Sequence, residues 1–307
     1  MKRAVNCGLV KADNMKQAIL LLSFGTPRQP SDLLPYLTSI RRGKIPTERE
    51  LKVLTARYDA IGQWDNKLLQ TMGEEQKRTL KSLLAIDAMY LAYLHMPNSM
   101  EQAIESIATA GYTSILCIVT SPFYSMIGTG AYERKLHSIL RAYPDISCEI
   151  IKSWWNRPQF FEYWRSQLMA ENPLQADTAC IFSAHSVPTS TVGSYEDEVM
   201  SASNQIAKMV GLNHWYQAWQ SAAPYGEWLG PTIESVIEQA LIDGAKRIVC
   251  IPFGFVSDHV EILYDNDIIC RNIVENAGAT YERLPMPNGN TLFMEAMAKA
   301  IRERINK

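Results

Sequence analysis

The chain has 307 residues, of which 47% are hydrophobic and 20% are charged, and its formal net charge is −2. This length allows one large or two ordinary domains, and the composition is typical of a globular protein in water. The near-neutral charge, without a clustered run of lysine and arginine, excludes an electrostatic surface for nucleic acid, and no apolar stretch approaches the ~20 residues that cross a bilayer.

The first segment, residues 1–14, is predicted to be an extension that precedes the folded domain. It starts with basic residues, but its apolar run is broken at Asn6 and ends at Lys11. It therefore lacks the apolar centre that a signal peptide requires. We expect the folded part to begin near Met15.

The apolar run over residues 17–24 predicts a buried parallel strand that stops at Gly25. Three helices are predicted after it, over residues 32–42, 47–60 and 67–84. From residue 88 onward, strand-like and helix-like runs alternate. The strands are predicted over residues 88–94, 114–121, 148–154, 178–183, 215–219, 247–253 and 280–284, and the helices over 99–110, 131–141, 159–170, 195–210, 231–243, 258–275 and 291–305.

Strands that alternate with helices of this length indicate βαβ units and parallel sheets with right-handed crossovers. We therefore predict an α/β fold of two similar lobes, each a parallel four-stranded sheet flanked by helices. The first lobe is expected over residues 15–148 and the second over residues 149–287. The cleft between two such lobes is a common site for a small molecule.

The six cysteines are spread over the chain, and no C-x-x-C occurs. Cys117, Cys180 and Cys250 lie within apolar runs, where a free thiol behaves as a small hydrophobic side chain. This pattern favours the reducing cytoplasm and argues against an iron–sulfur cluster or a structural zinc site. We expect a cytoplasmic protein.

Polar residues gather just after the buried strand that begins at Arg247. They are Asp258, His259, Glu261 and Asp265. In a parallel sheet, ligands bind just beyond the carboxyl ends of the strands, and His185 follows another strand in the same way. Oxygen and imidazole groups in such a cluster suggest a divalent metal or a proton-transfer site.

His185, Asp258 and Glu261 also have an ordinary structural explanation. A single histidine after a strand is more often a hydrogen-bonded loop residue than a ligand. Asp258 and Glu261 have the spacing of a helix capping box, which contributes ~1 kcal/mol and needs no chemistry. That explanation leaves Asp265 without a role, because a second carboxylate one helical turn further on repels the first. A path for a cation accounts for both carboxylates.

Two arginine-containing segments precede these residues in the chain. Arg41 and Arg42 end a predicted helix, where they complement the helix dipole by ~0.3–1 kcal/mol. Guanidinium groups beside an apolar helix face also suit a flat apolar ligand with carboxylate edges. Arg57 and Tyr58 supply another such pair, since arginine can bind a carboxylate through two hydrogen bonds. The residues alone leave both explanations open.

Short motifs recur along nearly the whole chain. They are Phe24–Pro27, Ile40–Gly43, Arg57–Gly62, Ser153–Trp155, Ser183–Pro188, Trp219–Ser221, Trp228–Pro231, Gly254–Glu261, Tyr264–Asp267 and Met286–Asn288. In this order they resemble the ferrochelatase family of haem biosynthesis, and most of all the Gram-positive type that inserts ferrous iron into coproporphyrin III. The resemblance implies a two-lobed fold whose C-terminal segment, residues 288–307, packs back on the first lobe. It also implies porphyrin and ferrous iron as substrates, no tightly bound cofactor, and a monomer.

The resemblance assigns roles to single residues. His185 and Glu261 match the catalytic pair that binds the incoming metal and handles protons, and Asp265 continues the metal route. The positions that contact the porphyrin and its propionates are matched by Arg41, Arg57, Tyr58 and Tyr132. Phe24 and Asp65 occupy two further substrate-binding positions with changed residue types.

These changes bear on the activity. Phe24 stands where the Gram-positive type often has a tyrosine that ligates the product iron, and phenylalanine cannot do so. Asp65 stands where a serine donates to a propionate, which an aspartate repels. Ile269 interrupts the line of acids that begins at Glu261. The alternatives are therefore chelation of another divalent metal (cobalt, nickel), another tetrapyrrole such as protoporphyrin IX, or a haem- or coprohaem-binding carrier without catalysis.

Overall fold

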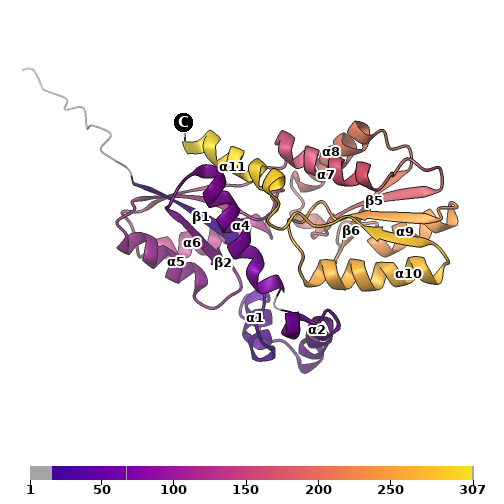
Figure 1. The fold of residues 1–307 in the computed structure, drawn as a ribbon. Coiled ribbons are helices and arrows are strands. Elements are labelled where there is room, and N and C mark those ends of the chain that lie inside the picture. Colours follow the sequence, from indigo (N-terminus) through magenta and orange to yellow (C-terminus); the bar gives the residue numbers. More distant parts are fainter. Residues whose placement is uncertain (1–15, 67, 224, 306–307) are drawn as a thin grey trace, which may run out of the picture.

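The computed structural model describes residues 16–66, 68–223 and 225–305, and the extension expected over residues 1–14 lies outside them. Two parallel sheets form the framework of the described chain (Figure 1). The first has the order β2-β1-β3-β4 and comprises β1 (Gln17–Ser23), β2 (Met89–Tyr93), β3 (Ser114–Val119) and β4 (Ser147–Ile151). The second has the order β6-β5-β7-β8 and comprises β5 (Thr178–His185), β6 (Trp215–Gln220), β7 (Arg247–Ile251) and β8 (Thr280–Arg283).

Both sheets repeat one strand order, which confirms the predicted α/β fold of two similar four-stranded lobes. In each sheet the first and third strands lie at the centre, where both faces are covered, and their sequences are accordingly almost entirely apolar. β4 pairs with β3 and continues to Ile151. The first sheet therefore extends past the expected lobe boundary at residue 148.

Helices cover both faces of each sheet. The helices of the first lobe are η1 (Pro30–Asp32), α1 (Leu33–Ile40), α2 (Glu48–Ala60), α3 (Gln63–Asn66), α4 (Leu68–Leu84), α5 (Ser99–Thr109) and α6 (Thr129–Leu140). Around the second sheet are α7 (Pro158–Ala170), η2 (Thr189–Thr191), α8 (Tyr195–Val210), α9 (Ile233–Ile242), the π-helix η3 (Ile262–Cys270) and α10 (Arg271–Asn276), and α11 (Thr291–Ile305) ends the described chain. Alternate residues of β1 serve opposite faces, as strand geometry requires: Ile19 and Leu21 join one core cluster, and Leu20 joins another with α5 and α6.

The C-terminal helix α11 packs against α4 of the first lobe and α7 of the second (Figure 1). Its fully buried Phe293 lies with its ring centre 5.5 Å from that of Trp154 and 5.2 Å from that of Tyr163. Further along, Arg302 donates from Nη2 to the Leu83 carbonyl at the end of α4 (2.8 Å). The core of the molecule thus continues from one lobe to the other through this helix.

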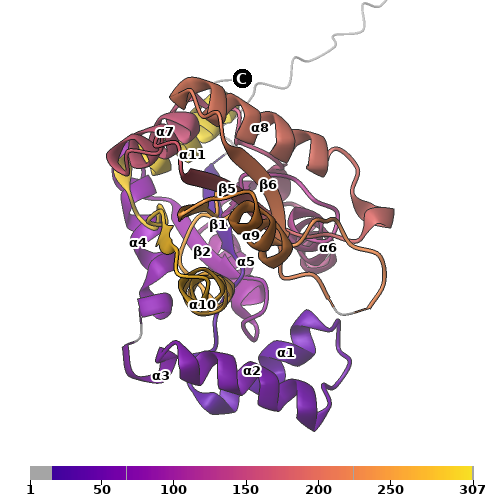
Figure 2. The ribbon, with the colours of Figure 1, turned by 90° about the vertical axis from the view of Figure 1, so that its right-hand side faces the viewer.

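The helices α1 and α2 project below the two sheets (Figures 1 and 2). A capping box between Thr47 and Glu50 fixes the start of α2. Near the end of α2, the guanidinium of Arg57 lies 3.5 Å from the carboxylate of Asp265 in the second lobe. This projection therefore brings first-lobe side chains to the carboxyl edge of the second sheet.

Candidate active site

His185 and Glu261 come together at the carboxyl edge of the second sheet. His185 is the last residue of β5, and Glu261 follows β7, the strand beside it. From β5 the chain continues to β6 on one side, whereas β7 leads to β8 on the other, so this edge is a topological switch point, where α/β proteins bind ligands. Nε2 of His185 lies 3.6 Å from Oε1 of Glu261.

Gly254 explains how the loop after β7 approaches β5 so closely. Its backbone N–H donates to the Ser183 carbonyl (3.1 Å). A Cβ atom at this position would stand 2.5 Å from Cβ of Ala184, so any larger residue would push the loop away from His185. The next residue, Phe255, then places its ring centre 6.3 Å from that of His185.

The segment after this loop differs from its prediction. A continuous α-helix was expected over residues 258–275, but the helix begins at residue 260 and winds as the π-helix η3 before α10. The capping-box explanation of Glu261 is wrong, because the Glu261 N–H donates to Nδ1 of His259 (3.3 Å). The carboxylate of Asp258 instead faces Arg283 and Asn288. Short π-helical segments are frequent at functional sites.

His185 and Glu261 each shift the pKa of the other and thereby favour the charged form of both side chains. Burial alone lowers the pKa of His185, but the charge of Glu261 and a hydrogen bond to it raise that pKa to about 9. Burial raises the pKa of Glu261, and the neighbouring imidazolium overrides it and lowers the value to about 2. Nδ1 of His185 donates to the Ser186 carbonyl (2.5 Å), which leaves Nε2 toward Glu261. The two side chains are 36% and 30% exposed, so a ligand can reach them.

Asp265 has partners of its own. Ser221 donates from Oγ to its carboxylate (2.8 Å), and Arg57 faces the other carboxylate oxygen. Burial raises the pKa of Asp265 to about 6, against the lowering effect of Arg57. Within the described residues no three His, Cys, Asp or Glu side chains gather closely enough to hold a metal ion. The role of Asp265 as a further ligand, with His185 and Glu261, stays a prediction.

The two predicted propionate-binding arginines also have intramolecular partners. Arg41 pairs with Glu50 of α2. Arg57, besides facing Asp265, lies over the ring of Tyr264, 5.0 Å from its centre. Arg57 therefore stands at the edge of the site, whereas Arg41 is held against α2. Contact of either guanidinium with a porphyrin stays a prediction.

The predicted porphyrin-binding tyrosines are buried in the first lobe. Tyr58 stacks on Trp64 with ring centres 5.4 Å apart, and burial raises its pKa to about 12. Tyr132 belongs to the core between the first sheet and α6, and burial raises its pKa as well. The charge of Glu261 also raises the pKa of Tyr58.

Phe24 and Asp65 complete the predicted set. Phe24 is 46% exposed at the end of β1, and its ring centre lies 4.4 Å from that of His95. Asp65 belongs to α3, and its side chain lies outside the part of the chain that the structure describes. No role was predicted for His95, and Ser221 was noted only as the last residue of the motif Trp219–Ser221. Ser221 follows β6 directly, so the rule that drew attention to His185 could have found it.

Solved structures that share this two-lobed arrangement include a protein described as the sirohydrochlorin chelatase SirB. SirB from Bacillus subtilis, solved with Fe³⁺, aligns with a TM-score of 0.61 over 94% of this chain and 95% of its own, at 13% identity. CbiX, described as the terminal enzyme of sirohaem biosynthesis in denitrifying bacteria, aligns with a TM-score of 0.52 over 93% and 98%, at 14% identity. Likeness at such identities shows the fold, which is that of the chelatases.

Sequence comparison identifies the protein family, which the fold alone does not. The ferrochelatase family model matches residues 16–305. The coproporphyrin III ferrochelatase of Geobacillus kaustophilus (strain HTA426) is 32% identical over 301 residues, which cover 93% of this chain and 95% of the relative. That of Staphylococcus aureus (strain COL) is 31% identical over 303 residues, covering 94% and 98%. The chain belongs to the ferrochelatase family, as its motifs indicated.

Proposed function

We propose that this protein inserts Fe²⁺ into coproporphyrin III, with His185 and Glu261 as the catalytic pair. The observation that carries the proposal is the 3.6 Å separation of an imidazole and a carboxylate at the switch point of the second sheet. The names of the relatives support iron and coproporphyrin III as the substrates. Iron is here a substrate that passes through the site.

Insertion replaces two pyrrole protons with one divalent cation, so the site must accept two protons and release a weakly held metal. With a pKa of about 9, His185 is protonated in the ligand-free protein at neutral pH. It must lose this proton before it can accept one from a pyrrole nitrogen or bind the cation. Glu261 is ionised above its pKa of about 2. Its carboxylate can therefore stabilise either positive charge at the site, the proton that leaves His185 or the cation that arrives. An imidazole and a carboxylate hold Fe²⁺ less tightly than the four porphyrin nitrogens do, so the cation can be transferred from them to the porphyrin.

An anaerobic absorbance assay with Fe²⁺ tests the substrate assignment. We expect many turnovers per protein molecule with coproporphyrin III and slower insertion into protoporphyrin IX. Faster insertion of Co²⁺ or Ni²⁺ would favour a different metal. The departures from the family pattern at Phe24, Asp65 and Ile269 motivate a carrier without catalysis as the second candidate. Stoichiometric binding of preformed haem without any turnover would establish the carrier and contradict the enzyme.

No helix in the described part of the chain is long and apolar enough to cross a membrane. The five described cysteines are free, which supports the inferred cytoplasmic location. We propose that the protein is a monomer. Light scattering at assay concentration checks this, and a dimer mass would contradict it.

A further inference from the structure

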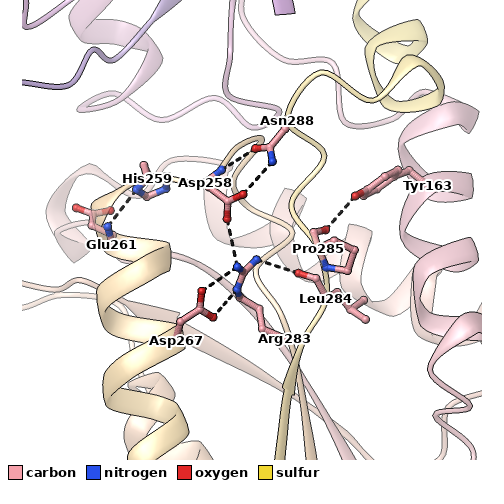
Figure 3. A network of polar contacts seen from close by, with 9 residues as sticks. All are labelled: Tyr163, Asp258, His259, Glu261, Asp267, Arg283, Leu284, Pro285 and Asn288. Atoms are coloured by element: carbon pink, nitrogen blue, oxygen red, sulfur yellow. Dashed lines mark hydrogen bonds and ion pairs between the residues drawn. The ribbon is translucent and has the colours of Figure 1, made fainter. Parts of the chain in front are cut away.

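Arg283, at the end of β8, connects two carboxylates that flank Glu261 in the sequence (Figure 3). It donates to both oxygens of Asp267, from Nε (2.6 Å) and from Nη2 (2.9 Å). Nη2 also lies 3.2 Å from Oδ1 of Asp258. The side chain is only 13% exposed, so these ion pairs are largely shielded from water.

Asn288 holds the same segment from the other side (Figure 3). Its side-chain oxygen accepts from the Asp258 backbone N–H (2.9 Å), and its amide nitrogen donates to the Asp258 carboxylate (2.8 Å). Its own N–H donates to the Val256 carbonyl (3.0 Å). Its carbonyl accepts from Gln76 of α4 in the first lobe (3.2 Å). Asn288 therefore ties the loop before Glu261 to the other lobe.

These contacts fix the chain on both sides of Glu261. Asp258 anchors the start of its helical segment, and Asp267 anchors the π-helix that follows. The ion pairs of Arg283 and the side-chain hydrogen bonds of Asn288 described above go to Asp258 and Asp267 rather than to the catalytic pair. We propose that Arg283 and Asn288 are positioning residues that hold the Glu261 carboxylate opposite His185. This inference rests on the proposed function, because it assigns the two residues to the same site.

The chain offers close controls for both residues. Arg247 begins β7 at the opposite edge of the same sheet, is 15% exposed, and pairs with Glu171 and Glu282. Asn98 shares the left-handed backbone of Asn288, with φ of 54° against 51°, but it makes no side-chain cap. Replacing Asn288 or Asn98 with glycine removes the side chain without straining that backbone.

The test compares Arg283→Lys with Arg247→Lys, and Asn288→Gly with Asn98→Gly. We expect the Arg283 and Asn288 variants to lower kcat for Fe²⁺ insertion by about 10- to 100-fold, as loss of residues that orient metal ligands does. KM for the porphyrin should stay within about twofold of wild type, while KM for Fe²⁺ rises. The control variants should keep kcat within about twofold at a similar loss in Tm. A kcat for Arg283→Lys and Asn288→Gly equal to that of the controls would overturn the proposal.

A second measurement does not depend on turnover. In crystal structures of the four variants, the His185–Glu261 separation should lengthen beyond 3.6 Å only where Arg283 or Asn288 is replaced. An unchanged separation in both of those variants would overturn the positioning role. Absence of turnover in the wild-type protein would instead refute the proposed function, and the crystal structures would still decide the role of Arg283 and Asn288.

Discussion

His185 and Glu261 set each other's protonation. Burial disfavours the charged form of each side chain, and the opposite charge beside it is the main compensation. Each group should therefore lose its shifted pKa when the other is removed. A ligand-free site then holds an imidazolium–carboxylate pair at neutral pH, ready to exchange its proton for a cation.

Replacing Glu261 with glutamine should lower the pKa of His185 from about 9 toward its ordinary value of 6.5. The substitution removes the carboxylate that raises this pKa and leaves the burial that lowers it. NMR titration of the His185 ring in the ligand-free protein measures the change. A His185 pKa still near 9 in Glu261→Gln would show that another group holds the proton.

His95 provides a pH dependence with the opposite sign. Burial lowers its pKa from 6.5 to about 4, so the folded protein stays unprotonated there while the unfolded chain takes up a proton. Its contribution to the free energy of unfolding therefore falls as pH drops from about 6.5 to about 4. Urea unfolding over this range should show a smaller fall for His95→Asn than for wild type. Equal slopes would refute this.

Because both follow predicted strands, His185 and Glu261 could be expected from the sequence to lie close together. The interaction partners of the other site residues could not be predicted in this way. His185 and Glu261 each follow an apolar run, and parallel sheets bring such ends together. The partners of Arg41 and Arg57 depend on how α2 is placed against its surroundings. Local sequence patterns do not encode that placement, so the residues left the role of these arginines open and the family resemblance favoured a ligand.

At the level of elements, the π-helix η3 is the main feature that the sequence did not predict. The spacing of its apolar residues fits an α-helix about as well as a π-helix. The hydrogen bonds of the two helix types span lengths that differ by only one residue. A contact outside the helix accompanies its wider turns: Asn266 donates to Gln220 of β6 (3.2 Å). Such a partner becomes visible only once the strands are in place.

The helix α11 should contribute strongly to stability through Phe293, which is fully buried between the lobes. We expect Phe293→Ala to lower the free energy of unfolding by about 3–5 kcal/mol, the usual range for a buried phenylalanine. The adjacent Leu292 is 38% exposed, and Leu292→Ala should change it by less than about 1 kcal/mol. Denaturant unfolding of both variants gives the comparison. Equal losses would show that α11 does not join the two lobes energetically.

For the whole molecule, alternating strands and helices were enough to predict two parallel four-stranded lobes, because βαβ units allow few other arrangements. The boundary at residue 148 fell inside β4, because it was placed at the start of the strand predicted over residues 148–154 rather than after that strand. The return of α11 to α4 came from the family resemblance. Amphipathic periodicity shows that a helix packs, without showing which lobe it meets.

The most direct test is a double-mutant cycle on metal insertion. Anaerobic kcat values with Fe²⁺ and coproporphyrin III are measured for wild type, His185→Ala, Glu261→Gln and the double variant, with porphyrin binding checked by fluorescence quenching. If the pair acts as a unit, each single variant loses at least about 100-fold in kcat while still binding porphyrin, and the double variant loses little more. Full activity in either single variant would contradict the account.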